Sequence, residues 1–246
     1  MKINVLFSHN NIDELYFTSK TAIVIDVLRA SSTIVTALQN GAKEIIPVSS
    51  VEFAVKISGG LFTGQTLMCG ERNTKKIEGF ALGNSPLEFT EDIVSGKSII
   101  LYTTNGSRAV VKAKFSENLF VASFLNLSAV AKHLVEMKKD FEIVCSGRGN
   151  TISLEDIICS GKLITEVQKL IEDIQLSDSA KASISLNKSF GRNILKMLKE
   201  TEHGQILIEN GFEKDIEYCS KLNILEAIPT FTNNALRLLL PTKLVA

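Results

Sequence analysis

Apolar strands that alternate with amphipathic helices dominate the pattern of hydrophobic and polar positions in this chain. Short, continuous apolar runs are typical of strands buried on both faces, and apolar positions spaced three and four apart are typical of helices. We predict strands at 22–28, 44–48, 66–69, 98–102, 119–122, 141–145 and 225–228, with helices between them. This order predicts an α/β fold with three layers, α/β/α, around a mostly parallel or mixed sheet.

The stretch from about Glu166 to Asn223 departs from this alternation. It keeps the helical period without strands, and therefore predicts a helical insertion at about 166–223, ahead of the last strand. No linker rich in Pro, Gly or Ser separates it from the rest of the chain. We therefore expect one α/β domain over residues 1–246.

Three of the predicted strands run directly into a short polar loop and then into a helix. The loops begin at Arg29, Thr103 and Ser146. The first backbone N–H groups of a helix have no partner within the helix, and the helix dipole makes that end positive, so a helix start is suited to an oxyanion. Three such helix starts at one sheet edge predict an anion-binding pocket.

Composition restricts the kind of partner. The 246 residues are 45% hydrophobic, which is enough for a sizeable core. The 27 basic residues balance the 27 acidic ones, so no global field favours a nucleic acid or an anionic membrane, and any attraction for anions is local. Without a signal-peptide pattern or a run long enough to span a membrane, we expect a soluble, cytoplasmic protein.

Several familiar catalytic and metal-binding patterns are missing from the sequence. GxxxxGK[ST] and GxSxG do not occur, which disfavours a P-loop nucleotide site and an α/β-hydrolase elbow. The four cysteines form no CxxC, and the three histidines form no HExxH, so we expect buried, reduced thiols and no histidine-rich zinc site.

Asp26 is a carboxylate inside an otherwise apolar strand. An ionised group in that position needs a partner, which either a metal ion or Arg29 would supply. A purely structural pairing of Asp26 with Arg29 is the alternative. Ser31 or Ser32 is expected to cap the following helix, beside N–H groups that can hold phosphate.

The second loop repeats this arrangement at Asn105, Gly106, Ser107 and Arg108. Gly106 permits an unusual backbone angle and the close approach of a ligand, and Arg108 can bind an oxyanion through two parallel donors. A polar turn with a surface arginine is the alternative. We expect a binding role because the same spacing of polar residues after a strand recurs in the first loop.

The third loop contains Ser146 and Gly147 and is followed by Glu155 and Asp156 in the first turn of a helix. Carboxylates in a first turn ordinarily complement the helix dipole. If Asp26 lies across the cleft, however, the three carboxylates could share Mg²⁺, which takes carboxylates, waters and phosphate oxygens.

A run of charge at 70–79 includes Glu71 and Arg72. A solvated loop is the default interpretation of such a run. The alternative is a loop that closes over an anionic ligand with Arg72 facing inward.

Seven segments together resemble the 2-phosphosulfolactate phosphatase family, the magnesium-dependent enzymes of coenzyme M biosynthesis. In order, these segments are Ile25–Thr33, Gly70–Arg72, Gly79–Pro86, Thr103–Arg108, Ala122–Asn126, Ser153–Asp156 and Asp215–Cys219. The similarity extends over most of the chain. It implies an α/β/α fold, a Mg²⁺ cofactor, and hydrolysis of 2-phospho-3-sulfolactate to 3-sulfolactate and phosphate.

On this hypothesis Mg²⁺ binds to Asp26, Glu155 and Asp156, and the catalytic residues are Asp26, Arg29 and Glu155. The small, anionic, phosphorylated and sulfonated substrate is expected to contact Ser31, Ser32, Glu71, Arg72, Asn84, Asn105, Gly106, Ser107, Arg108, Ser146 and Gly147. The spacing leaves open whether water attacks directly or Asp26 first accepts the phosphoryl group. We expect a homodimer.

Two other functions fit the same residues. One is a phosphatase for another small phosphorylated hydroxy acid, because a few loop side chains decide the substrate. The other is a non-catalytic module that binds an anionic metabolite without turnover. A panel of phosphorylated hydroxy acids, scored by phosphate release, separates these functions.

Overall fold

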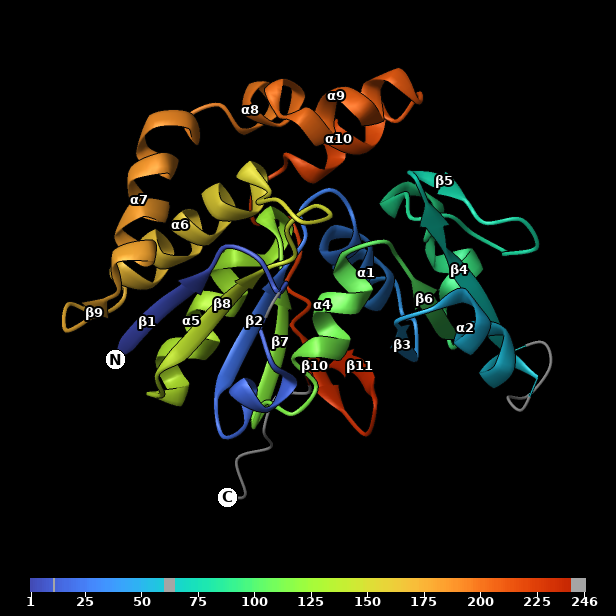
Figure 1. Cartoon of the computed structure of the whole chain (residues 1–246), viewed down its shortest axis with the longest axis horizontal. Coiled ribbons are helices and arrows are strands. Elements are labelled where there is room, and N and C mark those ends of the chain that lie inside the picture. The colour runs from blue at the N-terminus through green and yellow to red at the C-terminus, as the bar shows by residue number, and fades with distance from the viewer. Residues whose placement is uncertain (11, 60–64, 240–246) are drawn as a thin grey trace.

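Eleven strands and ten α-helices make up the described part of the chain, residues 1–10, 12–59 and 65–239 of a computed structural model (Figure 1). The strands are β1 Lys2–Leu6, β2 Thr21–Ile25, β3 Glu44–Val48, β4 Thr66–Arg72, β5 Lys75–Lys76, β6 Ser98–Tyr102, β7 Asn118–Ala122, β8 Phe141–Cys145, β9 Gln175–Leu176, β10 Pro229–Thr232 and β11 Ala235–Leu238. The α-helices are α1 Ala30–Gln39, α2 Val51–Ser58, α3 Glu91–Val94, α4 Gly106–Lys112, α5 Leu127–Met137, α6 Leu154–Gln168, α7 Asp178–Phe190, α8 Ile194–Glu200, α9 Glu202–Glu209 and α10 Glu213–Cys219.

All eleven strands form one mixed sheet in the order β5-β4-β6-β3-β11-β10-β7-β2-β8-β1-β9. It contains two parallel blocks: the first block is β7, β2, β8, β1 and β9, and the second block is β4, β6 and β3. The antiparallel hairpin β10–β11 joins them, with Thr230 paired to Phe120 of β7 and Leu236 paired to Ile45 of β3. The sheet is therefore continuous only through the C-terminal hairpin.

Strand β2 is buried along its whole length because helices cover both of its faces. Ile23 and Ile25 pack in a core with α5, α6 and α7, while Ala22 and Val24 pack on the opposite face with α1 and α4. Strict alternation of polar and apolar residues is absent for this reason. The predicted α/β class, with helices on both faces of the sheet, is confirmed.

Helices α1 and α4 serve both blocks. Ile34 and Leu38 of α1 share one hydrophobic core with Leu101 of β6 and Val121 of β7. Helix α2 covers the other face of the second block, where Ala54 packs with Ile100. Figure 1 shows α1 and α4 between the two sets of strands, so each block has the predicted helix–sheet–helix layering and the middle helices are shared.

Six of the seven predicted strands occur within a few residues of their predicted bounds, and one prediction is wrong. Residues 225–228 form no strand, because the backbone N–H of Leu225 donates to the carbonyl of Leu125 and that of Ala227 donates to the side chain of Gln39. The strand begins only at Pro229. The sequence patterns missed β1, β5, β9 and β11, most of which are short edge or hairpin strands.

The helical stretch predicted at 166–223 corresponds to α7, α8, α9 and α10, with the short strand β9 as an unpredicted addition at the sheet edge. In Figure 1 these helices pass from the side of the first block across the ends of its strands. All four cysteines are buried and free, as predicted. Within the described residues, no helix combines the length and apolar character needed to cross a bilayer.

Close packing of α6 on α7 provides a test of the fold. A methyl group at Gly161 would collide with the carbonyl of Ser183 on α7, so Gly161→Ala should destabilise the protein by about 1–3 kcal/mol. Gly59→Ala is the matched control, because nothing lies within 4 Å of its added methyl. The urea midpoint of unfolding measures both changes. An unchanged midpoint for Gly161→Ala would show that the two helices do not pack this closely.

Candidate active site

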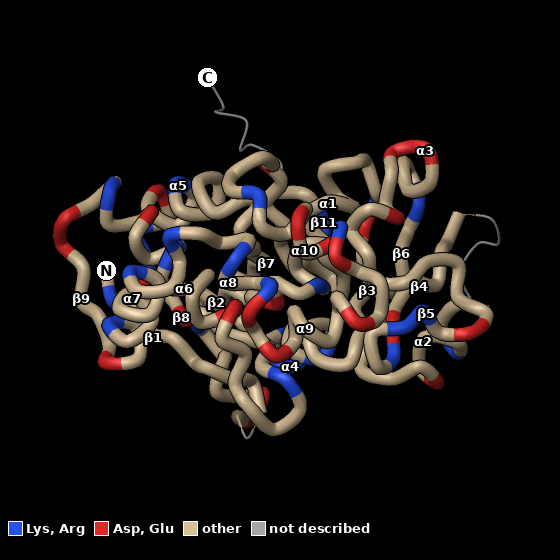
Figure 2. The backbone as a smooth tube through the Cα atoms, turned by 90° about the horizontal axis from the view of Figure 1, so that it is seen from above, with Lys and Arg blue, Asp and Glu red and all other residues tan. Residues whose placement is uncertain are grey.

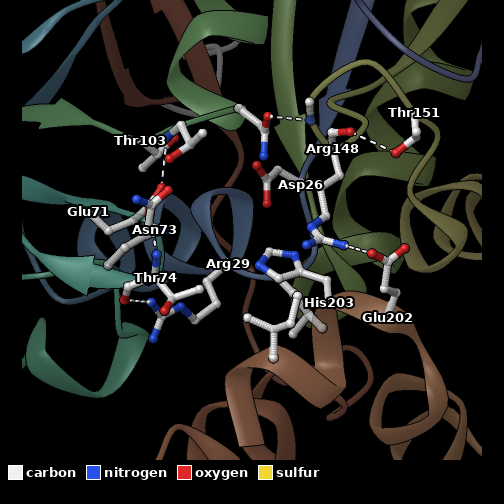
Figure 3. A pocket seen from close by; sticks show the side chains of 16 residues that line it. Asp26, Arg29, Glu71, Asn73, Thr74, Thr103, Arg148, Thr151, Glu202 and His203 are labelled. Atoms are coloured by element: carbon white, nitrogen blue, oxygen red, sulfur yellow. Dashed lines mark hydrogen bonds and ion pairs between the residues drawn. The ribbon is translucent and has the colours of Figure 1, made fainter. Parts of the chain in front are cut away.

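The carboxyl ends of four strands from both blocks meet around one pocket of about 470 Å³ (Figure 3). Strands β2 and β8 belong to the first block, and β4 and β6 to the second. Helix α9 contributes a further side of the pocket. The lining residues are Asp26, Leu28, Arg29, Glu71, Asn73, Thr74, Asn84, Thr103, Thr104, Asn105, Arg148, Gly149, Thr151, Glu202, His203 and Ile206.

Asp26 lies at the centre of this arrangement, directly after β2, and is only 6% exposed. Its Oδ1 accepts the N–H of Ala30 at 3.2 Å. Burial raises the pKa of Asp26 to about 6, and the negative charge of Glu71 adds to this, while His203, the Ala30 N–H and Ser146 act in the opposite direction. Asp26 is thus a carboxyl whose proton equilibrium lies close to neutral pH.

Ser31 and Ser32 do not line the pocket. Both are buried within α1, which begins at Ala30 without a side-chain cap, so the prediction that one of them caps the helix is wrong. The Ser31 hydroxyl accepts the N–H of Asp26 at 2.8 Å, and the Ser32 hydroxyl donates to the carbonyl of Val27 at 2.9 Å. The two hydroxyls therefore hold the loop that carries Asp26.

Asp156 ties together the loops that follow β2 and β8. Its Oδ1 accepts the N–H of Val27 and its Oδ2 accepts the hydroxyl of Ser146, both at 2.9 Å. It is 1% exposed, and burial, with the charges of Asp26 and Glu155, raises its pKa well above the usual value. Asp156, Ser146 and the neighbouring Gly147 do not line the pocket, and Asp156 holds the two loops together.

Glu155 faces His203, a residue that sequence reasoning did not select. The Oε1 atom of Glu155 lies 3.6 Å from Nδ1 of His203. Burial alone would raise the pKa of Glu155, but the approach and charge of His203 outweigh it and leave that pKa below its usual value. His203 stands alone in an amphipathic helix without any motif, so no sequence signal marked it.

The three predicted magnesium ligands lie close together but do not share an open coordination site. In the part of the chain that the structure describes, no group of three or more His, Cys, Asp or Glu side chains is placed to hold a metal ion. Asp156 uses both oxygens within the protein, Glu155 faces His203, and only Asp26 lines the pocket. Binding of Mg²⁺ stays a prediction.

Glu71 connects two loops that form the side of the pocket contributed by the second block. Its Oε1 accepts the N–H of Thr104 at 2.7 Å, and its Oε2 accepts the N–H of Thr74 at 2.9 Å. Arg72, which was expected to face inward, is exposed and does not line the pocket. The neighbouring Asn73 and Thr74 line it instead, in a turn with positive φ at both residues.

Arg29 lines the pocket but is paired away from Asp26. Its Nη1 lies 2.6 Å from Oδ2 of Asp215 in α10, and its Nη2 donates to the carbonyl of Thr74 at 2.9 Å. Its guanidinium also stacks on the ring of Phe212, 4.0 Å from the centroid. The alternative in which Asp26 and Arg29 pair is therefore not found; Arg29 instead joins three segments around the pocket.

The second predicted loop contributes less to the pocket than expected. Asn105 lines it and accepts the N–H of Gly149 at 3.2 Å. The hydroxyl of Ser107 is buried and bonds to Thr103 and Val48. Arg108 is exposed and lies outside the lining, because this position of α4 faces solvent while the next two residues face the core.

Gly106 is required because Asp26 packs against it, and not because of an unusual backbone angle as predicted. Its backbone does not lie in the left-handed region, and the group that approaches it is Asp26. A Cβ at this position would lie 2.5 Å from Oδ2 of Asp26 and would also collide with Ala30. The absence of a side chain lets α4 pack directly against the carboxylate.

Arg148 is the arginine that the third loop supplies to the pocket, although it was not selected from the sequence. Its Nη1 lies 2.5 Å from Oε1 of Glu202 at the start of α9 (Figure 3). Acidic and basic residues are interspersed elsewhere along the chain in Figure 2, so the field at the pocket depends on local groups.

Three polar side chains in the pocket have an atom without a partner. Among the described residues, four buried side-chain oxygens make no hydrogen bond, and three of them line the pocket: Thr74 Oγ1, Asn84 Oδ1 and Thr104 Oγ1. A buried polar group left unpaired costs about 1–3 kcal/mol. Their concentration at one pocket is what a binding site for a polar ligand requires.

These features define an α/β protein with a polar, carboxylate-containing pocket at the ends of its strands. The family model of 2-phosphosulpholactate phosphatase matches residues 7–234, and the chain belongs to this family. This confirms the resemblance seen in the sequence and the enzyme class, a phosphoric monoester hydrolase.

Three curated relatives illustrate the similarity, and each is named a probable 2-phosphosulfolactate phosphatase. The protein from Clostridium acetobutylicum is 40% identical over 233 residues, 95% of this chain and 98% of the relative. The protein from Caldanaerobacter subterraneus is 41% identical over 230 residues, with coverage of 94% and 95%. The protein from Thermotoga maritima is 43% identical over 215 residues, with coverage of 87% and 90%.

The raised pKa of Asp26 predicts a cost in stability. Between pH 3.8 and about 6 the unfolded chain loses this proton while the folded protein keeps it. The free energy of unfolding therefore falls as pH rises through this range, and above about pH 6 the loss stays the same size. Asp26→Asn should therefore raise the free energy of unfolding by about 1–3 kcal/mol at pH 7.5 and leave it nearly unchanged at pH 4. Urea unfolding in EDTA measures this.

The exposed Asp92→Asn is the control for that experiment and should change stability little at either pH. A loss of stability in Asp26→Asn at pH 7.5 would contradict the assignment of Asp26 as a carboxyl that burial destabilises.

Proposed function

We propose that this protein hydrolyses the phosphate ester of 2-phospho-3-sulfolactate, giving 3-sulfolactate and phosphate, with Mg²⁺ as cofactor. The observation that carries the proposal is membership of the 2-phosphosulpholactate phosphatase family across residues 7–234. The pocket supports it independently. A cavity of about 470 Å³ suits a three-carbon acid with three charged groups, and its lining is rich in polar side chains.

The charges around the pocket favour a divalent cation. Asp26 and Glu71 are acidic, and the two arginines of the lining are already paired, Arg29 with Asp215 and Arg148 with Glu202. An anionic ester would therefore meet little uncompensated positive charge from the protein. Mg²⁺ is usually held by one or two carboxylates together with waters and substrate phosphate, and not by a closed set of protein ligands. A pocket with two carboxylates and room for a phosphate ester fits this kind of binding.

Asp26 is the residue that would hold the ion, because it is central and is the one of the three predicted ligands that lines the pocket. When bound, Mg²⁺ would neutralise charge on the phosphate and polarise it. The protein's own part is to keep Asp26 in place. Ser31, Ala30 and the close approach of α4 at Gly106 do this.

The wall around Glu71 would orient the rest of the substrate. The hydroxyls of Thr74 and Thr104 are free to donate, and Asn84 offers an amide beside them. Sulfonate and carboxylate oxygens accept such donors. Because Glu71 binds the backbone N–H of both threonines, the two hydroxyls are held on one rigid support.

A substrate panel with and without chelator tests the proposal. Phosphate release should be fastest from 2-phospho-3-sulfolactate and at least about 100-fold less efficient, in kcat/KM, from 2-phospholactate, which lacks the sulfonate. Excess EDTA should abolish turnover, and added Mg²⁺ should restore it. Preference for another phosphorylated hydroxy acid, or saturable binding without phosphate release, would establish one of the two alternative functions instead.

The unpartnered hydroxyl of Thr104 gives a sharper test of where the substrate lies. Thr104→Val should raise KM about 5- to 10-fold, because one hydrogen bond to the substrate is lost, while stability stays equal or rises because no partner within the protein is lost. Ser116→Ala is the matched control, since its hydroxyl is also unpartnered but lies outside the pocket lining. An unchanged KM for Thr104→Val would show that the substrate does not contact this side of the pocket.

A further inference from the structure

Helix α9 presents one imidazole to the pocket from a rigid support. The hydroxyl of Thr201 accepts the N–H of Gly204 at 3.1 Å and so caps the helix at its start. Gly204 packs so closely on the carbonyl of Leu198 in α8 that a side chain there would collide with it. His203 and Ile206, three residues apart on the same face, are turned to the pocket.

The contact with Glu155 fixes which edge of the His203 ring faces the pocket. Nδ1 lies 3.6 Å from the buried carboxylate of Glu155, so Nε2, on the opposite side of the ring, points away from it. Figure 3 shows the ring below Asp26 and beside Arg148, among the side chains that line the cavity. A carboxylate behind a histidine holds the ring in one orientation.

Apart from Asp26, which the proposed function assigns to the ion, few groups in the pocket can release a proton to a substrate. Arg29 and Arg148 are paired with carboxylates, and a guanidinium is not a proton donor in catalysis at neutral pH. The other two histidines lie elsewhere: His9 contacts the carbonyl of Ser146, and His133 packs edge-on against Phe120. Among the lining residues that the structure describes, His203 is the only imidazole.

We propose that His203, oriented by Glu155, is the general acid that protonates the ester oxygen as it leaves the phosphorus. This inference rests on the proposed function, because it assigns a role within that hydrolysis. Glu155 acts as a positioning residue for the imidazole, which replaces the metal-binding role expected for it. The need for an acid is chemical: the leaving group is an alkoxide, a strong base that departs slowly unless it receives a proton.

The bond between phosphorus and the ester oxygen breaks, its electron pair stays on that oxygen, and the oxygen takes the Nε2 proton of the imidazolium. The attacking water forms the new P–O bond and leaves both of its protons on inorganic phosphate, H₂PO₄⁻. This product returns one proton to the imidazole before release, leaving HPO₄²⁻ and the regenerated acid.

Replacing the leaving oxygen by sulfur separates an acid from a merely structural residue. A thiolate leaves without a proton, because a thiol has a pKa of about 8.5. His203→Gln should lower kcat at least about 100-fold on the oxygen ester, with KM changed less than about 3-fold, but lower kcat less than about 5-fold on the isosteric sulfur-bridged ester. Glu155→Gln should show the same selectivity for the oxygen ester with a loss of about 10- to 100-fold.

His133→Gln is the control, because it makes the same change in a half-buried histidine away from the pocket, and it should keep kcat within about 2-fold on both esters. His203→Asn serves as a second variant if the glutamine variant does not match the wild-type urea midpoint. An equal loss of kcat on the oxygen and sulfur esters, or a change confined to KM, would overturn the role of His203.

The wild-type protein is assayed first on 2-phospho-3-sulfolactate. If it does not hydrolyse this ester, the proposed function fails. The comparison of oxygen and sulfur esters is then made on the panel member that is hydrolysed, so the outcome for His203 is measured separately.

Discussion

Burial of a carboxylate at the end of β2 is the constraint on which the site depends. Asp26 has a raised pKa because water is excluded from it, and its position is maintained by the Ala30 N–H, the Ser31 hydroxyl and the unsubstituted backbone of Gly106. Each of these contacts comes from the start of a helix that packs between the two blocks of the sheet. Burial of the Asp26 carboxylate lowers the free energy of unfolding, and the apolar core that α1 and α4 share offsets this cost.

The two blocks contribute different chemistry to the same pocket. The first block supplies Asp26 and Arg148, and α9 adds His203 beside them (Figure 3). The second block supplies Glu71, Thr74 and neutral hydrogen-bonding groups on the facing side. The proposed hydrolysis needs both sides: the side from the second block would bind and orient a small ester, and the side with Asp26 and His203 would cleave it.

The sequence predicted the strands and helices well where burial on both faces leaves a continuous apolar run, as in β2, β6 and β8. It predicted the loops around Asp26 and Glu71 because carboxylates beside apolar strands stand out. It did not predict which way side chains turn: Arg108 faces solvent and Ser32 bonds within its own loop. His203 escaped notice because its role depends on Glu155, distant in sequence, and such pairings arise only from tertiary packing.

A crystal structure with Mg²⁺ and 3-sulfolactate would show whether the strand ends of both blocks form one site around Asp26. We expect the ion on Asp26 and the product between Asp26 and the hydroxyls of Thr74 and Thr104. A product bound at the exposed face of α4 near Arg108, or an ion held by Glu155 and Asp156 without Asp26, would show that they do not.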